Sequence, residues 1–290
     1  MEAKLPPRLG IVIMLAAATC FASNHVAARI AFDHGASVAT GVVVRAAGTA
    51  LVLFLMMRVQ GVRIHVPRPA LIAGILVALQ SYCLYSAVAI IPAALALLVF
   101  QTSPMLFILL SWATGKEVPR WSAVAAILAA LLGLVLALNI RIEGLSMRWA
   151  EIGAGVSWAF AAAVSFVFVL YANANWLKAV DGKLRTFIMT TVTAIVVLAA
   201  GAAADAMKFP VDGQGWLGLA LLTVFYCIAM CTLFIVVHRI PPSSTVAMNF
   251  EPIALLGLGW VFLGQAVAPL QIAGALVTVG AIAWLGGAKK

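Results

Sequence analysis

Long apolar stretches run along the whole chain, separated by short breaks that hold nearly all of the charge. This feature constrains the fold more than any other. Ten such runs can be placed, and each is close to the roughly 20 residues that a helix needs to cross a bilayer. Only 9% of the 290 residues are charged, whereas about a quarter are charged in a soluble domain. Lipid must therefore replace water around most of the chain, which excludes a water-soluble fold.

The apolar runs divide into two sets of five, over residues 1–143 and 144–290. The expected spans are Leu9–Ile30, Val38–Met57, Pro69–Ile90, Ala93–Trp112, Trp121–Leu138, Ala150–Tyr171, Leu184–Ala204, Trp216–Val237, Ser243–Leu263 and Pro269–Leu285. None shows the alternation of a strand, and only a helix satisfies its own backbone inside a bilayer. We therefore predict an all-α integral membrane protein with ten transmembrane helices.

Lysine and arginine residues in the breaks predict the orientation of the chain. With the N-terminus inside, thirteen of them lie on the cytoplasmic side, and only Arg141, Arg148 and Lys208 lie on the other. Cytoplasmic loops carry an excess of these residues. We expect a multi-pass protein of the bacterial inner membrane with both termini in the cytoplasm. The net charge of +9 then reflects this bias and not a nucleic-acid surface.

The two halves share a pattern in their fourth and fifth spans. Pro104 and Pro252 lie near the middle of equivalent runs, and Glu117 and Gln265 follow at the same offset of 148 residues. Because five is an odd number, the second half must insert upside down relative to the first. Inverted repeats of this kind are typical of transporters, in which two similar halves exchange roles at the two membrane faces.

The same segments resemble a known family. They read IPAALALLVFQTSPM and GKEVPRW in the first half, and IPPSSTVAMNFEPI and GQAVAP in the second. With Arg45 early in the second span and a glycine-rich last span, the chain resembles the EamA-type members of the drug/metabolite transporter superfamily over nearly its whole length. The resemblance implies a ten-helix transporter, and within the superfamily a YddG-like exporter of aromatic amino acids. The chain departs from the pattern in two places: the seventh span has no counterpart of Arg45, and Gln265 replaces an acidic residue.

The mid-span prolines and one carboxylate are candidates for function. Proline removes a helical hydrogen bond and kinks the helix, so Pro104 and Pro252 are either hinges or static kinks. Glu251 is the only carboxylate well inside a predicted span, where an unpaired charge costs at least ~3 kcal/mol. It is either a proton site or a contact for a substrate amine, or else a structural partner of Arg45.

Aromatic and polar side chains in the middle of the spans suggest a binding site. Tyr82 and Tyr85 are three residues apart, and Ser81 and Tyr85 are four apart, so each pair is expected to share a helix face. In the first span, His25 and Arg29 share a face that suits a proton relay, a cavity rim or a hydrogen-bonded contact between helices. A cavity for flat ligands uses such a mixture, although packing or lipid-facing aromatics would look the same.

The candidate substrate-binding residues are Asn24, Gln80, Tyr82, Tyr85, Phe100, Gln101, Trp158, Phe166, Tyr226, Asn249 and Glu251, and the candidate hinges are Pro104 and Pro252. The function expected is export of small metabolites by alternating access, with aromatic or other amino acids as foremost substrates and multidrug or organic-cation efflux as the alternative. We expect contacts with small-molecule substrate and membrane lipid, no nucleic acid, and a monomer or homodimer.

Other functional classes fit the sequence poorly. It has no HExxH or GxSxG motif and no pair of aspartates within a span, so an intramembrane enzyme is not expected. No segment resembles the filter loop of a channel. The chain lacks a nucleotide-binding loop and the cysteine–histidine spacing of a zinc site, so we expect no metal or other cofactor.

Overall fold

The computed structural model describes residues 6–115, 121–137, 145–236, 247–248, 250–265 and 268–287. These residues form helices and their connections, with no strand among them. The helices are α1 (Pro7–Asp33), α2 (Val38–Val59), α3 (Arg68–Ile90), α4 (Ala93–Phe100), α5 (Ser103–Ala113), α6 (Trp121–Ala137), α7 (Leu145–Asn175), α8 (Gly182–Ala203), α9 (Gly213–Val236), α10 (Glu251–Leu263) and α11 (Pro269–Gly287).

These helices confirm the predicted spans. Within the described residues, seven stretches are long and apolar enough to cross a membrane, and α4 and α5 together supply one of them. Two shorter apolar stretches lie in α10 and α11. The part of the predicted ninth span before residue 247 lies outside the described residues.

Both mid-span prolines lie where a helix begins. The predicted fourth span is broken at Gln101 and Thr102, and Pro104 occupies the first turn of α5. Pro252 has the same place in α10. A proline in the first turn costs no hydrogen bond, because the first N–H groups of a helix lack an intrahelical partner. Pro104 thus follows a break that divides the fourth span into α4 and α5, which confirms the interruption predicted there.

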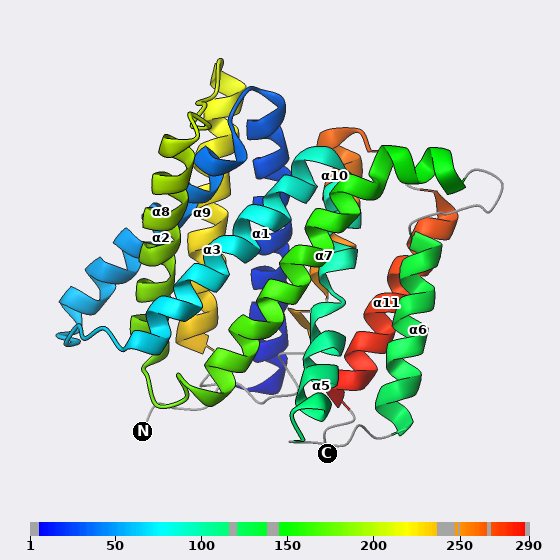
Figure 1. The fold of residues 1–290 in the computed structure, drawn as a ribbon, viewed down its shortest axis with the longest axis horizontal. Helices are drawn as coiled ribbons and strands as arrows, with labels where there is room; N and C mark the ends of the chain where they lie inside the picture. Colours follow the sequence, from blue (N-terminus) through cyan, green and yellow to red (C-terminus); the bar gives the residue numbers. More distant parts are fainter. Residues whose placement is uncertain are drawn as a thin grey trace.

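The main packing pairs are related by a two-fold pseudosymmetry that exchanges the halves (Figure 1). The α1–α9 pair corresponds to α3–α7, the α2–α9 pair to α3–α8, and the α1–α10 pair to the packing of α4 and α5 on α7. The α2–α8, α4–α10 and α6–α11 pairs are their own counterparts. Every one of these pairs joins one half to the other, so the two repeats interleave and do not form separate lobes.

Small residues allow the paired helices to approach closely. A Cβ on Gly218 of α9 would lie 2.8 Å from the backbone nitrogen of Ala31 in α1. A Cβ on Gly133 of α6 would lie 2.7 Å from the carbonyl oxygen of Gly274 in α11. The α6–α11 pair stands at one edge of the molecule, and α1 begins at the same end of the bundle as α11 ends (Figure 1).

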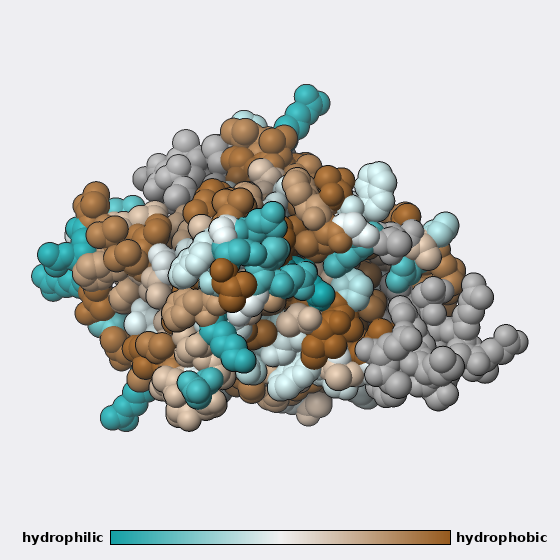
Figure 2. Space-filling view, turned by 90° about the horizontal axis from the view of Figure 1, so that it is seen from above, coloured by the Kyte–Doolittle hydropathy of each residue, from teal (hydrophilic) through white to brown (hydrophobic). Residues whose placement is uncertain are grey.

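A hydrogen-bonded clasp joins the α1–α2 and α8–α9 connections at the end opposite the termini. His34 Nδ1 lies 2.7 Å from Asp212 Oδ2, the Ser37 N–H donates to the Lys208 carbonyl, and the Val211 N–H donates to the His34 carbonyl. The Gly215 N–H and the His34 ring hold the pKa of Asp212 below its ordinary value. Figure 2 looks onto this end and shows hydrophilic residues near its middle, with hydrophobic residues around them.

Candidate functional site

Arg45 is the centre of a buried polar cluster formed by α1, α2, α3, α9 and α10. Arg45 is only 5% exposed, and it lies seven residues, or about 10 Å, inside the start of α2. The guanidinium carbon is 3.9 Å from the ring centroid of Tyr226 in α9 and 4.7 Å from that of Tyr85 in α3. Its Nη2 donates to Ser81 Oγ at 2.9 Å. Ser81 and Tyr85 therefore share a helix face, as their spacing predicts.

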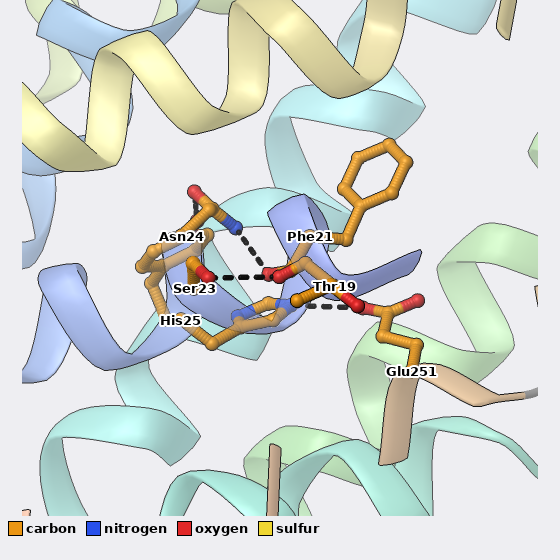
Figure 3. A network of polar contacts seen from close by, with 7 residues as sticks. Thr19, Phe21, Ser23, Asn24, His25 and Glu251 are labelled. Atoms are coloured by element: carbon orange, nitrogen blue, oxygen red, sulfur yellow. Dashed lines mark hydrogen bonds and ion pairs between the residues drawn. The ribbon is translucent and has the colours of Figure 1, made fainter. Parts of the chain in front are cut away.

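Tyr85 connects this cation to α1. The residue is fully buried, and its hydroxyl donates to Asn24 Oδ1 at 2.7 Å. Its ring centroid lies 5.7 Å from that of His25, and Phe32 contacts it edge-on. Asn24 in turn donates to the Phe21 carbonyl within α1 (Figure 3). One tyrosine thus contacts the cation through its ring and the first helix through its hydroxyl.

His25 and Glu251 form the second part of the cluster (Figure 3). His25 Nε2 lies 3.4 Å from Glu251 Oε1, which makes an ion pair when the imidazole is protonated. The two side chains are 6% and 16% exposed. The alternative in which Glu251 pairs with Arg45 is therefore wrong. Glu251 sits at the first position of α10, where the pair with α1 holds it and where the helix dipole favours an anion.

Four other predicted site residues form two aromatic pairs outside the Arg45 cluster. Tyr82 is 37% exposed and packs edge-on against Trp158 of α7, which is 39% exposed, so Tyr82 does not share the environment of Tyr85. Phe100 packs against Phe166 with ring centroids 5.2 Å apart. These two aromatic pairs lie between α7 and the α3–α4 segment.

The last three predicted site residues are Gln80, Gln101 and Asn249. Gln80 is partly buried, and its Oε1 accepts a hydrogen bond from Ser81 at 3.4 Å, so it borders the Arg45 cluster. Gln101 caps the C-terminus of α4 at the break before Pro104. Asn249 lies outside the described residues.

The structure assigns a place to two residues that the sequence-based site lacks. Ser81 holds Arg45, and His25 pairs with Glu251. The residues next to them in the chain indicate no such partners, because each contact joins two different helices. The spacing rules that place Ser81 and Tyr85 on one face act within a single helix, so they carry no information about a partner in another helix.

The cluster brings one cation, one carboxylate and several aromatic rings into the interior of the bundle. This combination can bind an organic ion through charge and ring stacking, whereas it lacks a nucleophile–base arrangement. Among the described residues, no group of three or more metal-ligating side chains comes together.

Comparisons with known proteins agree with this architecture. A solved protein crystal structure shares the fold, with a TM-score of 0.67 and 21% identity over 96% of each chain. A search of curated protein sequences gives no match. The profile of the EamA-like transporter family matches residues 8–139 and again residues 153–287, one match for each repeat. The chain therefore belongs to the EamA-like transporter family, whose members carry small molecules across membranes.

Proposed function

We propose that this transporter exports small metabolites by alternating access, and that aromatic and other amino acids are its substrates, as in YddG-like exporters. The buried cluster supports this proposal. The carboxylate and the side chain of an aromatic amino acid need a cation and a ring surface, and Arg45 and the two tyrosines offer these groups inside the spans. Contacts with the ligand would take the place of the contacts with water that these groups lose on burial.

The interleaved repeats support alternating access. Each main pairing has a counterpart in which the two halves exchange roles, or is its own counterpart. Two similar halves that exchange roles can open a site toward either face in turn. The cluster between α1, α2, α3, α9 and α10 is buried inside the bundle, whereas the α6–α11 pair stands at one edge of it (Figure 1). We therefore assign the cluster, and not the α6–α11 pair at the edge, to substrate binding.

Counterflow in proteoliposomes tests the substrate class. The vesicles contain unlabelled phenylalanine, labelled phenylalanine is added outside, and its accumulation is followed with and without a proton gradient. Accumulation above that of protein-free vesicles establishes a carrier for aromatic amino acids. If the accumulation persists without a gradient, transport does not require coupling to protons. No accumulation in either condition removes phenylalanine as a substrate.

Growth on a toxic phenylalanine analogue tests the direction of transport. Cells that overproduce the protein should tolerate the analogue better, because export lowers its internal concentration. Reduced tolerance in these cells would instead indicate uptake.

Organic-cation efflux is the second candidate, favoured by the buried carboxylate of Glu251. The variant Glu251→Gln keeps the shape of the side chain and removes its charge. If the substrate is a cation, this variant loses transport, because no other described carboxylate lies in the cluster. A neutral zwitterion should still be carried at a rate near that of the wild type. Retention of dye efflux by the variant would exclude Glu251 as the cation partner.

A further inference from the structure

The charge of Arg45 lacks an anionic partner in the described part of the chain. No carboxylate there lies within 4.0 Å of its guanidinium, and the three ion pairs that the described residues form use other groups. A buried charge is normally paired or hydrogen-bonded, since removing it from water is costly. The absence of a counter-ion at a 5% exposed arginine is therefore informative.

Arg29 in α1 provides the contrast within the same bundle. Its Nε lies 2.9 Å from Asp33 Oδ1, and its Nη1 donates to the carbonyl oxygens of Val88 and Ala89 at the end of α3. The Arg29 charge is neutralised, and its donors serve to join two helices. Arg45 has no such carboxylate partner, and its one hydrogen bond, to Ser81 of α3, leaves its charge unneutralised.

The tyrosine rings explain how an unneutralised cation remains inside the bundle. A desolvated cation–π contact contributes about 2 kcal/mol, and Arg45 makes two of them. An arginine at the centre of a membrane helix costs about 2.5–3.5 kcal/mol on insertion scales. The rings thus offset the cost of burial without removing the positive charge or using the N–H donors.

The donors of Arg45 are largely free. A guanidinium has five N–H groups in a fixed planar fork that matches a carboxylate. Nη2 donates to Ser81, while the buried Nε has no hydrogen-bond partner in the described structure. The neighbouring Tyr226 and Gln80 are only partly buried.

We propose that Arg45 anchors the carboxylate of the transported molecule, and that a carboxylate is therefore the group that all its substrates share. The proposal rests on the transport function above and narrows its substrate class. Substrates include monocarboxylates without an amino group, because Arg45 recognises the carboxylate. Amines that lack the acid bind weakly, whatever their ring.

A ligand series on the wild-type protein tests this without any substitution. Binding is measured on the purified full chain in lipid nanodiscs, with phenylalanine, with 3-phenylpropionate, which lacks the amine, and with phenylalaninol, which lacks the carboxylate. We expect both carboxylates to bind about 10- to 100-fold more tightly than phenylalaninol, the range for a hydrogen-bonded charge. Equal affinities, or no binding of either carboxylate, overturn the proposal.

Variants then connect the preference to Arg45. In Arg45→Met, the affinity for phenylalanine should fall by the same factor, to that of phenylalaninol, whose own affinity changes little. Arg45→Lys keeps the charge but loses the planar fork, so it should lie between the two, and it serves if Arg45→Met does not fold. The matched control is Arg29→Met, which removes the neutralised arginine and should leave the preference unchanged. An unaltered preference in a folded Arg45 variant overturns the proposal.

The two proposals fail in different ways. If carboxylates bind through Arg45 but phenylalanine shows no counterflow, then the anchor stands and amino-acid transport is wrong. If phenylalanine shows counterflow but Arg45→Met leaves the carboxylate preference intact, then the transport stands and the anchor is wrong.

Discussion

At the scale of single residues, the buried cluster depends on side chains that serve two neighbours at once. Tyr85 places its ring against Arg45 and its hydroxyl against Asn24. The two contacts have different consequences, since the ring offsets the burial of a charge and the hydroxyl satisfies a buried carbonyl oxygen. They can be separated by substitutions that remove one and keep the other.

The variant Tyr85→Phe keeps the ring and removes the donor. Asn24 Oδ1 then lies buried without its partner, so the free energy of unfolding should fall by about 1–3 kcal/mol. The affinity for substrate should stay near that of the wild type. Reversible unfolding in SDS and ligand binding measure the two quantities. The control is Tyr82→Phe, at a 37% exposed position of the same helix, where we expect a change within about 0.5 kcal/mol. Equal losses in both variants would contradict a special role for the Tyr85 hydroxyl.

Individual site residues could be identified from the sequence, but their partners could not. Arg45 and Glu251 are conspicuous because charge is rare inside apolar runs. The sequence could also place Ser81 and Tyr85 together, since they are four residues apart in one helix. Pairing of Glu251 with His25 depends on how α10 packs against α1, which no local pattern encodes. The same reason explains why Tyr82 faces Trp158 and not the Arg45 cluster.

At the scale of helices, the interruption of the fourth span is the feature that most directly concerns transport. The positions of the spans can be predicted from the length of the apolar runs, and the break in a helix can be predicted from the position of its proline. The separation of α4 from α5 at Gln101 and Thr102 creates a joint inside the membrane. A joint allows the two segments to tilt independently, which the alternating exposure of a site requires.

The variant Pro104→Ala tests whether this joint moves. Alanine supplies an N–H that can donate to the Phe100 carbonyl, so α4 and α5 should join into one helix over Ala93–Ala113. If the joint is a hinge, substrate affinity is retained while the transport rate falls several-fold. Pro69→Ala is the matched control, because Pro69 lies in the first turn of α3, at the end of a span. A normal transport rate with a straightened helix would identify the break as a static kink.

At the scale of the whole molecule, the pseudosymmetry relates two ends that are built differently. The clasp of His34 and Asp212 joins the α1–α2 and α8–α9 connections. Its counterpart joins the α2–α3 and α7–α8 connections, where the fully buried Leu177 packs among apolar side chains and Lys183 Nζ donates to Gln60. One end is thus closed by polar contacts and the other largely by apolar ones. Conditions that weaken charge pairs should therefore open the ends unequally.

Substitution of Asp212 should loosen the clasp end alone. In Asp212→Ala, the Ser37 and Val211 amides, whose hydrogen bonds join the two connections, should exchange with solvent deuterium about two- to fivefold faster, the effect of an exposed charge pair. The Val62 and Val180 amides at the other end are the control and should not change. Asp212→Asn, which removes the charge and keeps the shape, should give a smaller increase. Unchanged exchange at Ser37 and Val211 would show that the backbone bonds suffice without the carboxylate.

The pH dependence of the same amides follows from the sign of the pKa shift. The pKa of Asp212 is lower in the folded protein than its ordinary value, so the folded state favours the charged carboxylate. Its contribution is complete above the ordinary pKa of about 3.9 and is lost as the pH falls through the lower folded value. The ratio of exchange rates between Asp212→Ala and wild type should therefore stay constant from neutral pH down to mildly acidic pH, and approach one only in strong acid. A ratio that already falls between pH 7 and 5 would show that the charge of Asp212 does not set the strength of the clasp.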